Sequence, residues 1–180
     1  MKTFIALTFI GILTYAYGAT TGISECKTVT PMDGFSATRF FTRTWYVTHV
    51  QKKTSNTVCQ TFTASKPSNT TYAVDYTFTG DNGENNVHCV ATRTEEKKLT
   101  FNCKNGDTPI FDAVFVIMAT DYNNYALFYR CVTMKSSGVK DDNFLVLSST
   151  SGDQAIPASL TSLTSSLGLK SCEEIKTMVY

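Results

Sequence analysis

The sequence predicts an all-β fold: an eight-stranded antiparallel up-and-down barrel followed by one C-terminal helix. Two observations carry this prediction. Apolar and polar residues alternate with a period of two in a series of short segments, and clusters of Asn, Gly, Asp and Ser separate these segments. After the eighth segment the apolar residues recur at helical spacing. A barrel of eight strands encloses an interior that can hold one small ligand.

Each expected strand places apolar side chains on one face of the sheet. The turns between them contain residues that adopt a positive φ at low cost, as in residues 80–83 and 105–107, while residues 121–124 join two strands tightly. We place the strands at residues 45–50, 58–64, 72–79, 87–94, 99–103, 113–120, 125–133 and 144–148.

A helix is expected after the last strand. Pro157 suits its first turn, and Gly168 can end it. Leu160, Leu163 and Leu167 fall on one helical face, which would pack on the barrel wall.

The amino terminus has the composition of a secretory signal peptide. Lys2 precedes an apolar run over residues 4–17, and Ala16 and Gly18 supply the small residues that precede a cleavage site. The run is shorter than the roughly 20 residues that a membrane-spanning helix needs. We therefore expect residues 1–18 to be removed and residues 19–180 to form one secreted domain with no membrane insertion.

The charge balance excludes some partners. The chain has 16 basic and 15 acidic residues, and cleavage would remove Lys2 and no acidic residue. A mature chain without net charge argues against bulk electrostatic binding to nucleic acid or to an anionic membrane.

Cysteine usage fits an oxidising compartment. All six cysteines lie beyond residue 18, and an even number in a secreted chain implies three disulfides among 15 possible pairings. A Cys89–Cys103 bond has local support because it would join adjacent strands across a turn. The sequence has no Cys-x-x-Cys motif and only two histidines, which argues against a metal site.

Two motifs indicate a family. Residues 40–49 read Phe-Phe-Thr-Arg-Thr-Trp-Tyr-Val-Thr-His, and residues 120–122 read Thr-Asp-Tyr. With the six cysteines, these motifs resemble the triabin-like salivary lipocalins of blood-feeding bugs. The resemblance covers nearly all of the mature chain and implies a monomeric salivary barrel that binds a small molecule. It also implies the disulfide pairs Cys26–Cys131, Cys59–Cys172 and Cys89–Cys103.

The chain departs from the usual lipocalin motifs at two places. Arg43 stands where a glycine normally precedes the tryptophan by two residues. Residues 148–150 read Ser-Ser-Thr where an arginine normally follows the last strand and lies over the tryptophan ring. We still expect Trp45 to close the barrel floor, with Arg130 as the candidate replacement for that arginine.

The expected ligand site lies inside the barrel. Alternation from Trp45 places His49 inward near the open mouth, where amine carriers that resemble this chain have an aspartate. A histidine there disfavours serotonin and histamine and favours an anionic or neutral ligand. Such a ligand needs an apolar lining and a cation for any buried carboxylate. The expected lining is His49, Tyr72, Tyr76, Phe115 and Tyr129, with Arg39 or Arg130 as the counter-ion.

Haem and enzymatic chemistry are not expected. Haem carriage needs an axial histidine on a mid-barrel strand, and residues 72–76 in the matching region contain none. His88 is expected to face solvent. The sequence contains no Gly-x-Ser-x-Gly, His-Glu-x-x-His or phosphate-loop motif, and its cysteines are assigned to disulfides. We therefore predict a binding protein without a cofactor.

The first functional hypothesis is a secreted scavenger of a host haemostatic mediator, with a thromboxane-like eicosanoid as the first candidate. Removal by mass action would inhibit platelet aggregation or vasoconstriction. The alternative is a protein-directed anticoagulant, because the type member of the family blocks thrombin through its outer surface. Thrombin or a contact-phase protease would then be the partner. The short acidic runs at residues 95–96 and 173–174 give that alternative little support.

Two further features complete the expectations. A nucleotide at a basic mouth is a third hypothesis, based on the lysine pairs at residues 52–53 and 97–98. Asn69 begins an Asn-Thr-Thr sequon for N-glycosylation in an expected loop.

Overall fold

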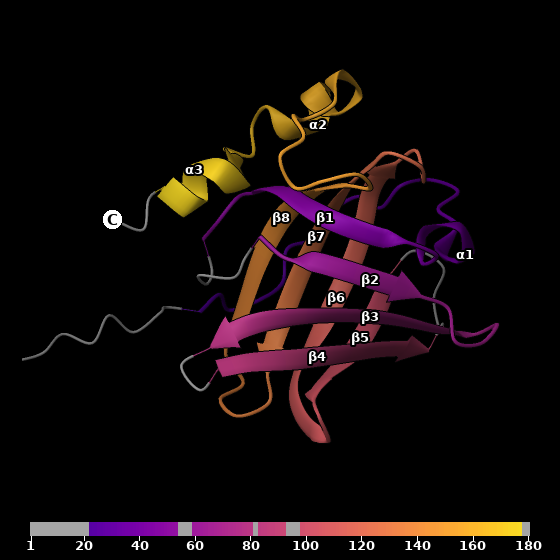
Figure 1. The fold of residues 1–180 in the computed structure, drawn as a ribbon, viewed down its shortest axis with the longest axis vertical. Helices are drawn as coiled ribbons and strands as arrows, with labels where there is room; N and C mark the ends of the chain where they lie inside the picture. The colour runs from indigo at the N-terminus through magenta and orange to yellow at the C-terminus, as the bar shows by residue number, and fades with distance from the viewer. Residues whose placement is uncertain (1–21, 54–58, 81–82, 93–97, 178–180) are drawn as a thin grey trace, which may run out of the picture.

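The computed structural model describes residues 22–53, 59–80, 83–92 and 98–177. Within these residues, eight long antiparallel strands form one closed barrel, with helical segments outside it (Figure 1). The sheet order follows the chain from β2 to β8 and continues to β1, which also pairs with β2 and closes the barrel. The predicted fold class is confirmed. The strands are β1 Thr44–Val50, β2 Thr61–Ser65, β3 Thr71–Gly80, β4 Gly83–Thr92, β5 Leu99–Asn105, β6 Thr108–Thr120, β7 Tyr125–Met134 and β8 Lys140–Ser148.

The strands differ in how many of their faces are buried. In β5 the buried residues Leu99, Phe101 and Cys103 alternate with exposed neighbours, as expected for a sheet with one solvated face. In β8 almost every residue is buried. The reason is that the amino-terminal segment and the carboxy-terminal segment pack on the outside of β6, β7 and β8, where Val116, Tyr129 and Leu160 belong to two outer clusters.

The carboxy-terminal segment is helical but shorter than expected. After Pro157 come a 3-10 turn, η1 Ala158–Leu160, and a single α-turn, α2 Thr161–Thr164. Leu160 is buried, but Leu163 is 42% exposed. The predicted three-leucine face is therefore wrong for Leu163, whereas Leu160 and Leu167 both pack against the barrel wall.

Three short elements were not expected from the sequence. They are α1 Ala37–Phe40, which precedes β1, a two-residue strand, β9 Lys170–Ser171, which pairs with the end of β1, and α3 Cys172–Thr177. Figure 1 shows α3 beside the end of β1. None of the helices in the described part of the chain has the length and apolar character that a membrane crossing requires.

The three disulfides match the pairing that the resemblance implies. Cys26–Cys131 ties the amino-terminal segment to β7, and Cys59–Cys172 ties the segment just before β2 to α3. Cys89–Cys103 joins β4 to β5 directly across the ladder. The signal peptide, residues 1–18, lies outside the described residues and stays a prediction.

Candidate ligand-binding site

One half of the barrel interior is filled by aromatic side chains. The Phe40 ring stacks on Trp45 at 5.0 Å, and the Phe101 and Phe115 ring centroids are 4.6 Å apart. The void that remains there is only about 20 Å³, room for about one water molecule. We call this region the packed half. Its inward side chains include Phe40, Phe41, Trp45, Phe62, Phe101, Phe115, Ile117 and Phe128.

Arg43 closes the packed half from outside. Its guanidinium lies 5.7 Å from the Trp45 ring centre, and Nη1 donates a 2.8 Å hydrogen bond to the Asn123 carbonyl. The turn that carries Asn123 is held by Asp121, whose Oδ1 accepts bonds from three successive backbone N–H groups. Burial alone would raise the pKa of Asp121, but these bonds lower it overall. Arg43 therefore does what we expected of Arg130, and that expectation is wrong.

The other half of the barrel opens into a pocket of about 740 Å³, which we call the mouth pocket. This volume lies within the range of about 300–1,000 Å³ that is typical of small-molecule sites. Most of the wall is apolar, and its polar residues lie in β3, β7 and β8 and in the chain between β1 and β2. The lining residues are Gly22, Ile23, Lys52, Lys53, Gln60, Tyr76, Phe78, Ile110, Phe111, Arg130, Val132, Met134, Val139, Asp141, Asp142 and Asn143.

Several polar groups of the mouth pocket are already satisfied by the protein. The buried Asp142 carboxylate contacts Lys52 Nζ and lies 3.5 Å from Lys27 Nζ. Burial alone would raise its pKa, but the lysines and a hydrogen bond from Tyr129 lower it overall. Asn143 accepts the backbone N–H groups of residues 51 and 52 and donates to the Lys52 carbonyl. These groups build the wall and are not free for a ligand.

Three other polar groups lack protein partners. Within the described residues, no carboxylate pairs with the half-buried Arg130 and no group bonds the Tyr76 hydroxyl. Burial raises the pKa of Tyr76, and the charge of Arg130 partly opposes that rise. The Gln60 Oε1 atom is buried and has no hydrogen-bond partner among the described residues. All three residues line the mouth pocket, so Tyr76 and Arg130 lie where the sequence predicted a ligand site.

His49 does not line the barrel, and its expected position is wrong. A β-bulge between Val47 and His49 shifts the alternation by one residue. His49 therefore pairs with Val146, whose side chain packs outside the barrel, while Val50 takes the inward position. The His49 ring forms a 3.0 Å hydrogen bond with the Thr48 hydroxyl and interacts electrostatically with Glu174 on α3.

Tyr129 also faces outward. The order of inward residues along β7 places Phe128 and Arg130 inside and Tyr129 in an outer cluster with Phe144. Its hydroxyl accepts the Lys27 N–H at 2.6 Å and donates to Asp142 at 3.1 Å. Burial and the nearby acids raise the pKa of Tyr129 to about 12. The amino-terminal segment covers this face, so the expected lining role of Tyr129 is wrong.

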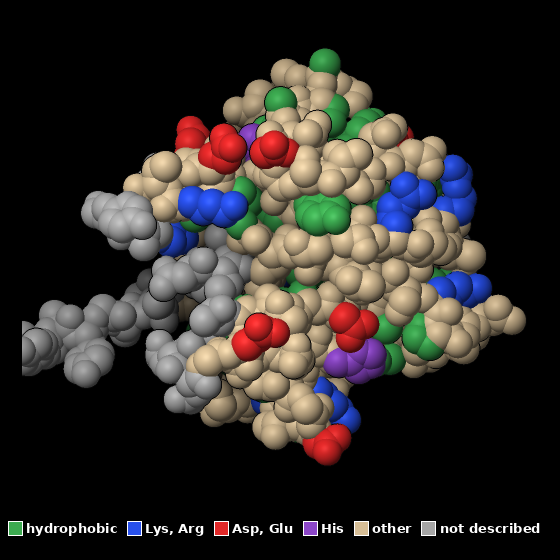
Figure 2. Space-filling view, viewed as in Figure 1, with side chains coloured by type: hydrophobic (Ala, Val, Ile, Leu, Met, Phe, Trp, Pro, Cys, Tyr) green, Lys and Arg blue, Asp and Glu red, His purple; other side chains and the backbone are tan. Residues whose placement is uncertain are grey.

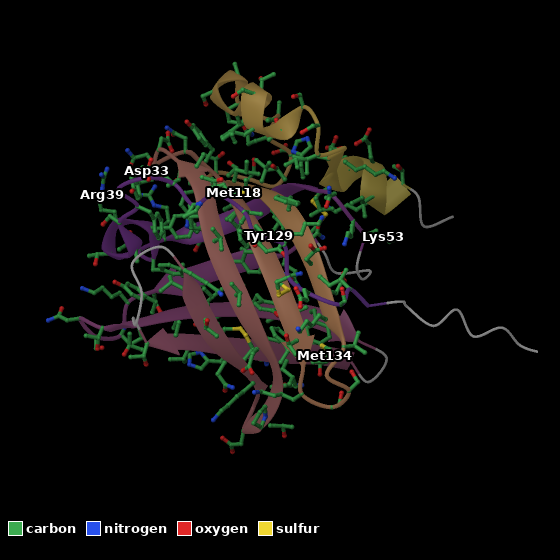
Figure 3. All side chains as sticks on the ribbon, turned by 180° about the vertical axis from the view of Figure 1, so that it is seen from behind. Asp33, Arg39, Lys53, Met118, Tyr129 and Met134 are labelled. Carbon is green, nitrogen blue, oxygen red and sulfur yellow. A yellow bond between two sulfur atoms is a disulfide. The ribbon has the colours of Figure 1, made fainter. Side chains whose placement is uncertain are left out.

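The remaining expected lining residues belong to the closed end. Tyr72 is fully buried against Phe41, and Phe115 lies in the packed half. The Arg39 guanidinium lies 4.0 Å from the Tyr122 ring centre. In Figure 3, Arg39 and Lys53 lie at opposite ends of the barrel. Arg39 is therefore not a counter-ion for the mouth pocket.

Other expected features lie outside the pocket. His88 is exposed and bonds Asp75 at 2.6 Å on the outer face of the sheet, as expected. Asn69 is exposed in the loop between β2 and β3, and its glycosylation stays a prediction. No group of three or more His, Cys, Asp or Glu side chains suited to a metal ion occurs among the described residues. Charged side chains are scattered over the face in Figure 2, without one dominant sign.

Sequence comparison finds relatives that align with almost the whole chain. The Triabin family profile matches residues 19–163. Procalin of Hospesneotomae protracta is 37% identical over 175 residues, which cover 96% of this chain and 99% of that protein. Triabin of Meccus pallidipennis is 36% identical over 156 residues, which cover 85% and 94% of the two chains.

Structural comparison finds ligand-bound lipocalin neighbours. A variant of LTBP1 in complex with leukotriene C4 has a TM-score of 0.61 and 29% identity, over 78% of this chain and 88% of that one. The amine-binding protein of Rhodnius prolixus, in its tryptamine complex, has a TM-score of 0.59 over 87% and 95% of the chains. At 16% identity it supports the fold alone. With a family profile that covers most of its length and relatives above 30% identity, this chain belongs to the triabin family, as a triabin-like triatomine lipocalin.

Proposed function

We propose that this protein is a secreted scavenger that sequesters an amphipathic, anionic host lipid in the mouth pocket. The first candidate ligand is a thromboxane-like eicosanoid, whose removal would inhibit platelet aggregation or vasoconstriction. The single observation that carries the proposal is an apolar pocket of about 740 Å³ that contains Arg130 with no carboxylate partner in the described chain.

The pocket chemistry favours an anion over an amine. An amine would need a free carboxylate, but Asp142 is buried against two lysines and Asp141 lies 3.8 Å from Lys52. A ligand carboxylate would instead gain a charge-assisted hydrogen bond from Arg130, which is stronger than a neutral one. Lys53 is exposed at the rim and adds positive potential.

The lining also suits an apolar chain. Phe78, Ile110 and Val132 line the mouth pocket beside the end of the packed half. Burial of apolar surface is worth roughly 25 cal/mol per Å², so a fatty chain in this pocket supplies much of the affinity. The leukotriene C4 complex of LTBP1 concerns a protein 29% identical to this one, and a bound eicosanoid in that relative supports the same ligand class here.

Binding can be tested by isothermal titration calorimetry of the disulfide-bonded mature protein. The ligands are a stable thromboxane analogue and leukotriene C4, with arachidonate, serotonin, ADP and haem as comparators. We expect one-to-one binding of the eicosanoids, weakened about 10- to 100-fold in Arg130→Ala, because a hydrogen bond to a charged group contributes about 1.5–3 kcal/mol.

Arg39→Ala is the matched control. It removes the same charge at the opposite end of the barrel and should leave eicosanoid binding unchanged. Absence of eicosanoid binding, or an equal loss in both variants, would contradict the proposal.

Protein-directed anticoagulation is the second candidate. Met134 and Val139 are 38% and 41% exposed, and both border the mouth on the β7–β8 hairpin. The Met134 N–H bonds the Val139 carbonyl at 2.9 Å, so the two residues are neighbours, and contiguous exposed apolar surface can mark a contact site. Clotting and amidolytic assays with thrombin and contact-phase proteases test this function, and a Met134→Ser, Val139→Ser double variant should abolish any inhibition that uses this hairpin.

A further inference from the structure

We propose that Gln60 is a specificity-determining residue of the mouth pocket, which accepts a hydrogen bond from a hydroxyl group on the ligand. The pocket would then select a hydroxylated fatty acid over an unsubstituted one. This inference rests on the proposed function and narrows its ligand class.

The position of Gln60 is fixed by its surroundings. It follows Cys59, which is bonded to Cys172 on α3. Its carbonyl accepts a 3.0 Å hydrogen bond from the Val47 N–H on β1. The backbone is therefore anchored on both sides, and the side chain lines the mouth pocket. A ligand group would meet an amide that is already placed.

The Gln60 Oε1 atom can accept a hydrogen bond from a ligand. It is buried without a hydrogen-bond partner in the part of the chain that the structure describes, and a buried polar atom is normally bonded. Two other side-chain atoms in the described chain share this condition, Arg43 Nε and Gln51 Oε1, but neither residue lines the mouth pocket. Of these three atoms, Gln60 Oε1 is therefore the one to which a ligand in the mouth pocket can donate a hydrogen bond.

A ligand whose only polar group is a carboxylate leaves one hydrogen-bond acceptor of the pocket unpaired. Its oxygens accept hydrogen bonds and donate none, so they can match Arg130 and the Tyr76 hydroxyl but leave Gln60 Oε1 unpaired. A hydroxyl group on the same ligand supplies the missing donor. A site with a buried acceptor discriminates strongly against an analogue that lacks the donor, because the acceptor is then left unpaired.

The test uses two ligands that differ by one hydroxyl group: arachidonate and a monohydroxy derivative of arachidonate. Calorimetry on the wild-type mature protein should show the hydroxylated acid bound at least about tenfold more tightly. Gln60→Met preserves side-chain length without the amide. It should reduce that preference to less than about threefold, mainly through weaker binding of the hydroxylated acid.

Gln51→Met is the matched control, because Gln51 Oε1 is also unpaired but lies outside the mouth pocket. It should leave the ligand preference unchanged. Thermal unfolding of the unliganded protein gives an independent readout: Gln60→Met should be at least as stable as the wild type, because it removes an unpaired buried acceptor. A lower melting temperature would indicate a structural role and would count against the proposal.

The outcomes separate this inference from the proposed function. If both acids bind equally and Arg130→Ala weakens both, the lipid-binding function holds and the role of Gln60 is refuted. If the preference survives in Gln60→Met, another group reads the hydroxyl and the role of Gln60 is again refuted. If neither acid binds, the proposed function and this inference fail together.

Discussion

The packed half and the mouth pocket belong to the same barrel, yet they differ in how far the inward side chains fill the interior. Around Trp45 the inward side chains are aromatic and meet in the centre, which leaves about 20 Å³. Toward the other end the inward residues are spaced around about 740 Å³. The difference indicates that side chains of the packed half contribute more to the stability of the fold than side chains around the mouth pocket.

The largest expected effect comes from the same substitution made in each region. Phe101 is fully buried between Phe41 and Phe115, so Phe101→Ala should lower the free energy of unfolding by about 3–5 kcal/mol. Phe78→Ala at the half-buried mouth should cost less than about 2 kcal/mol and should weaken lipid binding. Urea denaturation and calorimetry measure the two quantities. Equal losses of stability would show that the two halves are not energetically distinct.

The next effect concerns the mouth wall, where one carboxylate is structural. Asp142→Asn removes a buried charge that bonds Lys52 and Tyr129, and should cost about 1–3 kcal/mol at neutral pH. Because the pKa of Asp142 is lowered in the folded state, its contribution is present above the ordinary carboxyl pKa of about 4 and is lost as pH falls through the lowered value.

The difference between wild type and Asp142→Asn should therefore shrink in acid denaturation series below about pH 4. Asp141→Asn is the control, since that side chain is 43% exposed and pairs with Lys52 at 3.8 Å. A cost for Asp141→Asn as large as that for Asp142→Asn would show that burial does not set the contribution of these acids.

A smaller effect separates Arg43, which lies over Trp45, from Arg130, which the sequence had indicated for that position. Arg43→Ala removes the cation over Trp45 and the bond to the Asn123 carbonyl, and should cost about 1–2 kcal/mol. Arg130→Ala should leave the free energy of unfolding within about 0.5 kcal/mol and affect ligand binding instead. A reversed order in denaturant unfolding would mean that Arg130, and not Arg43, supports the barrel floor.

Much of the barrel was predictable because period-two alternation and turn residues are local signals. Each of the eight predicted strands overlaps an observed strand, and the disulfide pairing implied by family resemblance is present. The ligand site was less predictable. Alternation assigns a face only until a bulge occurs, and the bulge before His49 depends on pairing with β8, which the local sequence does not specify.

Tyr129 shows a second limit of sequence analysis. Strand β7 is apolar on both faces because the amino-terminal segment covers its outer side, so hydrophobicity alone does not mark the inward set. The sequence did not distinguish Arg39 from Arg130 as the counter-ion, although the two residues lie at opposite ends of the barrel. Gln60 carries no motif, and its unpaired oxygen is visible only in three dimensions.

The smallest expected effect tests whether His49 belongs to the outer wall. Burial lowers the pKa of His49 below 6.5 and Glu174 partly opposes this, so the unfolded chain binds more protons near that pH. The stability supplied by the neutral ring is therefore present above pH 6.5 and is lost as the pH falls through the lowered pKa of His49. His49→Gln should flatten the dependence of melting temperature on pH below 6.5, with lipid affinity unchanged. His88→Gln controls for the loss of an exposed histidine. Weaker lipid binding by His49→Gln would instead return His49 to the pocket, against the register that pairs it with Val146.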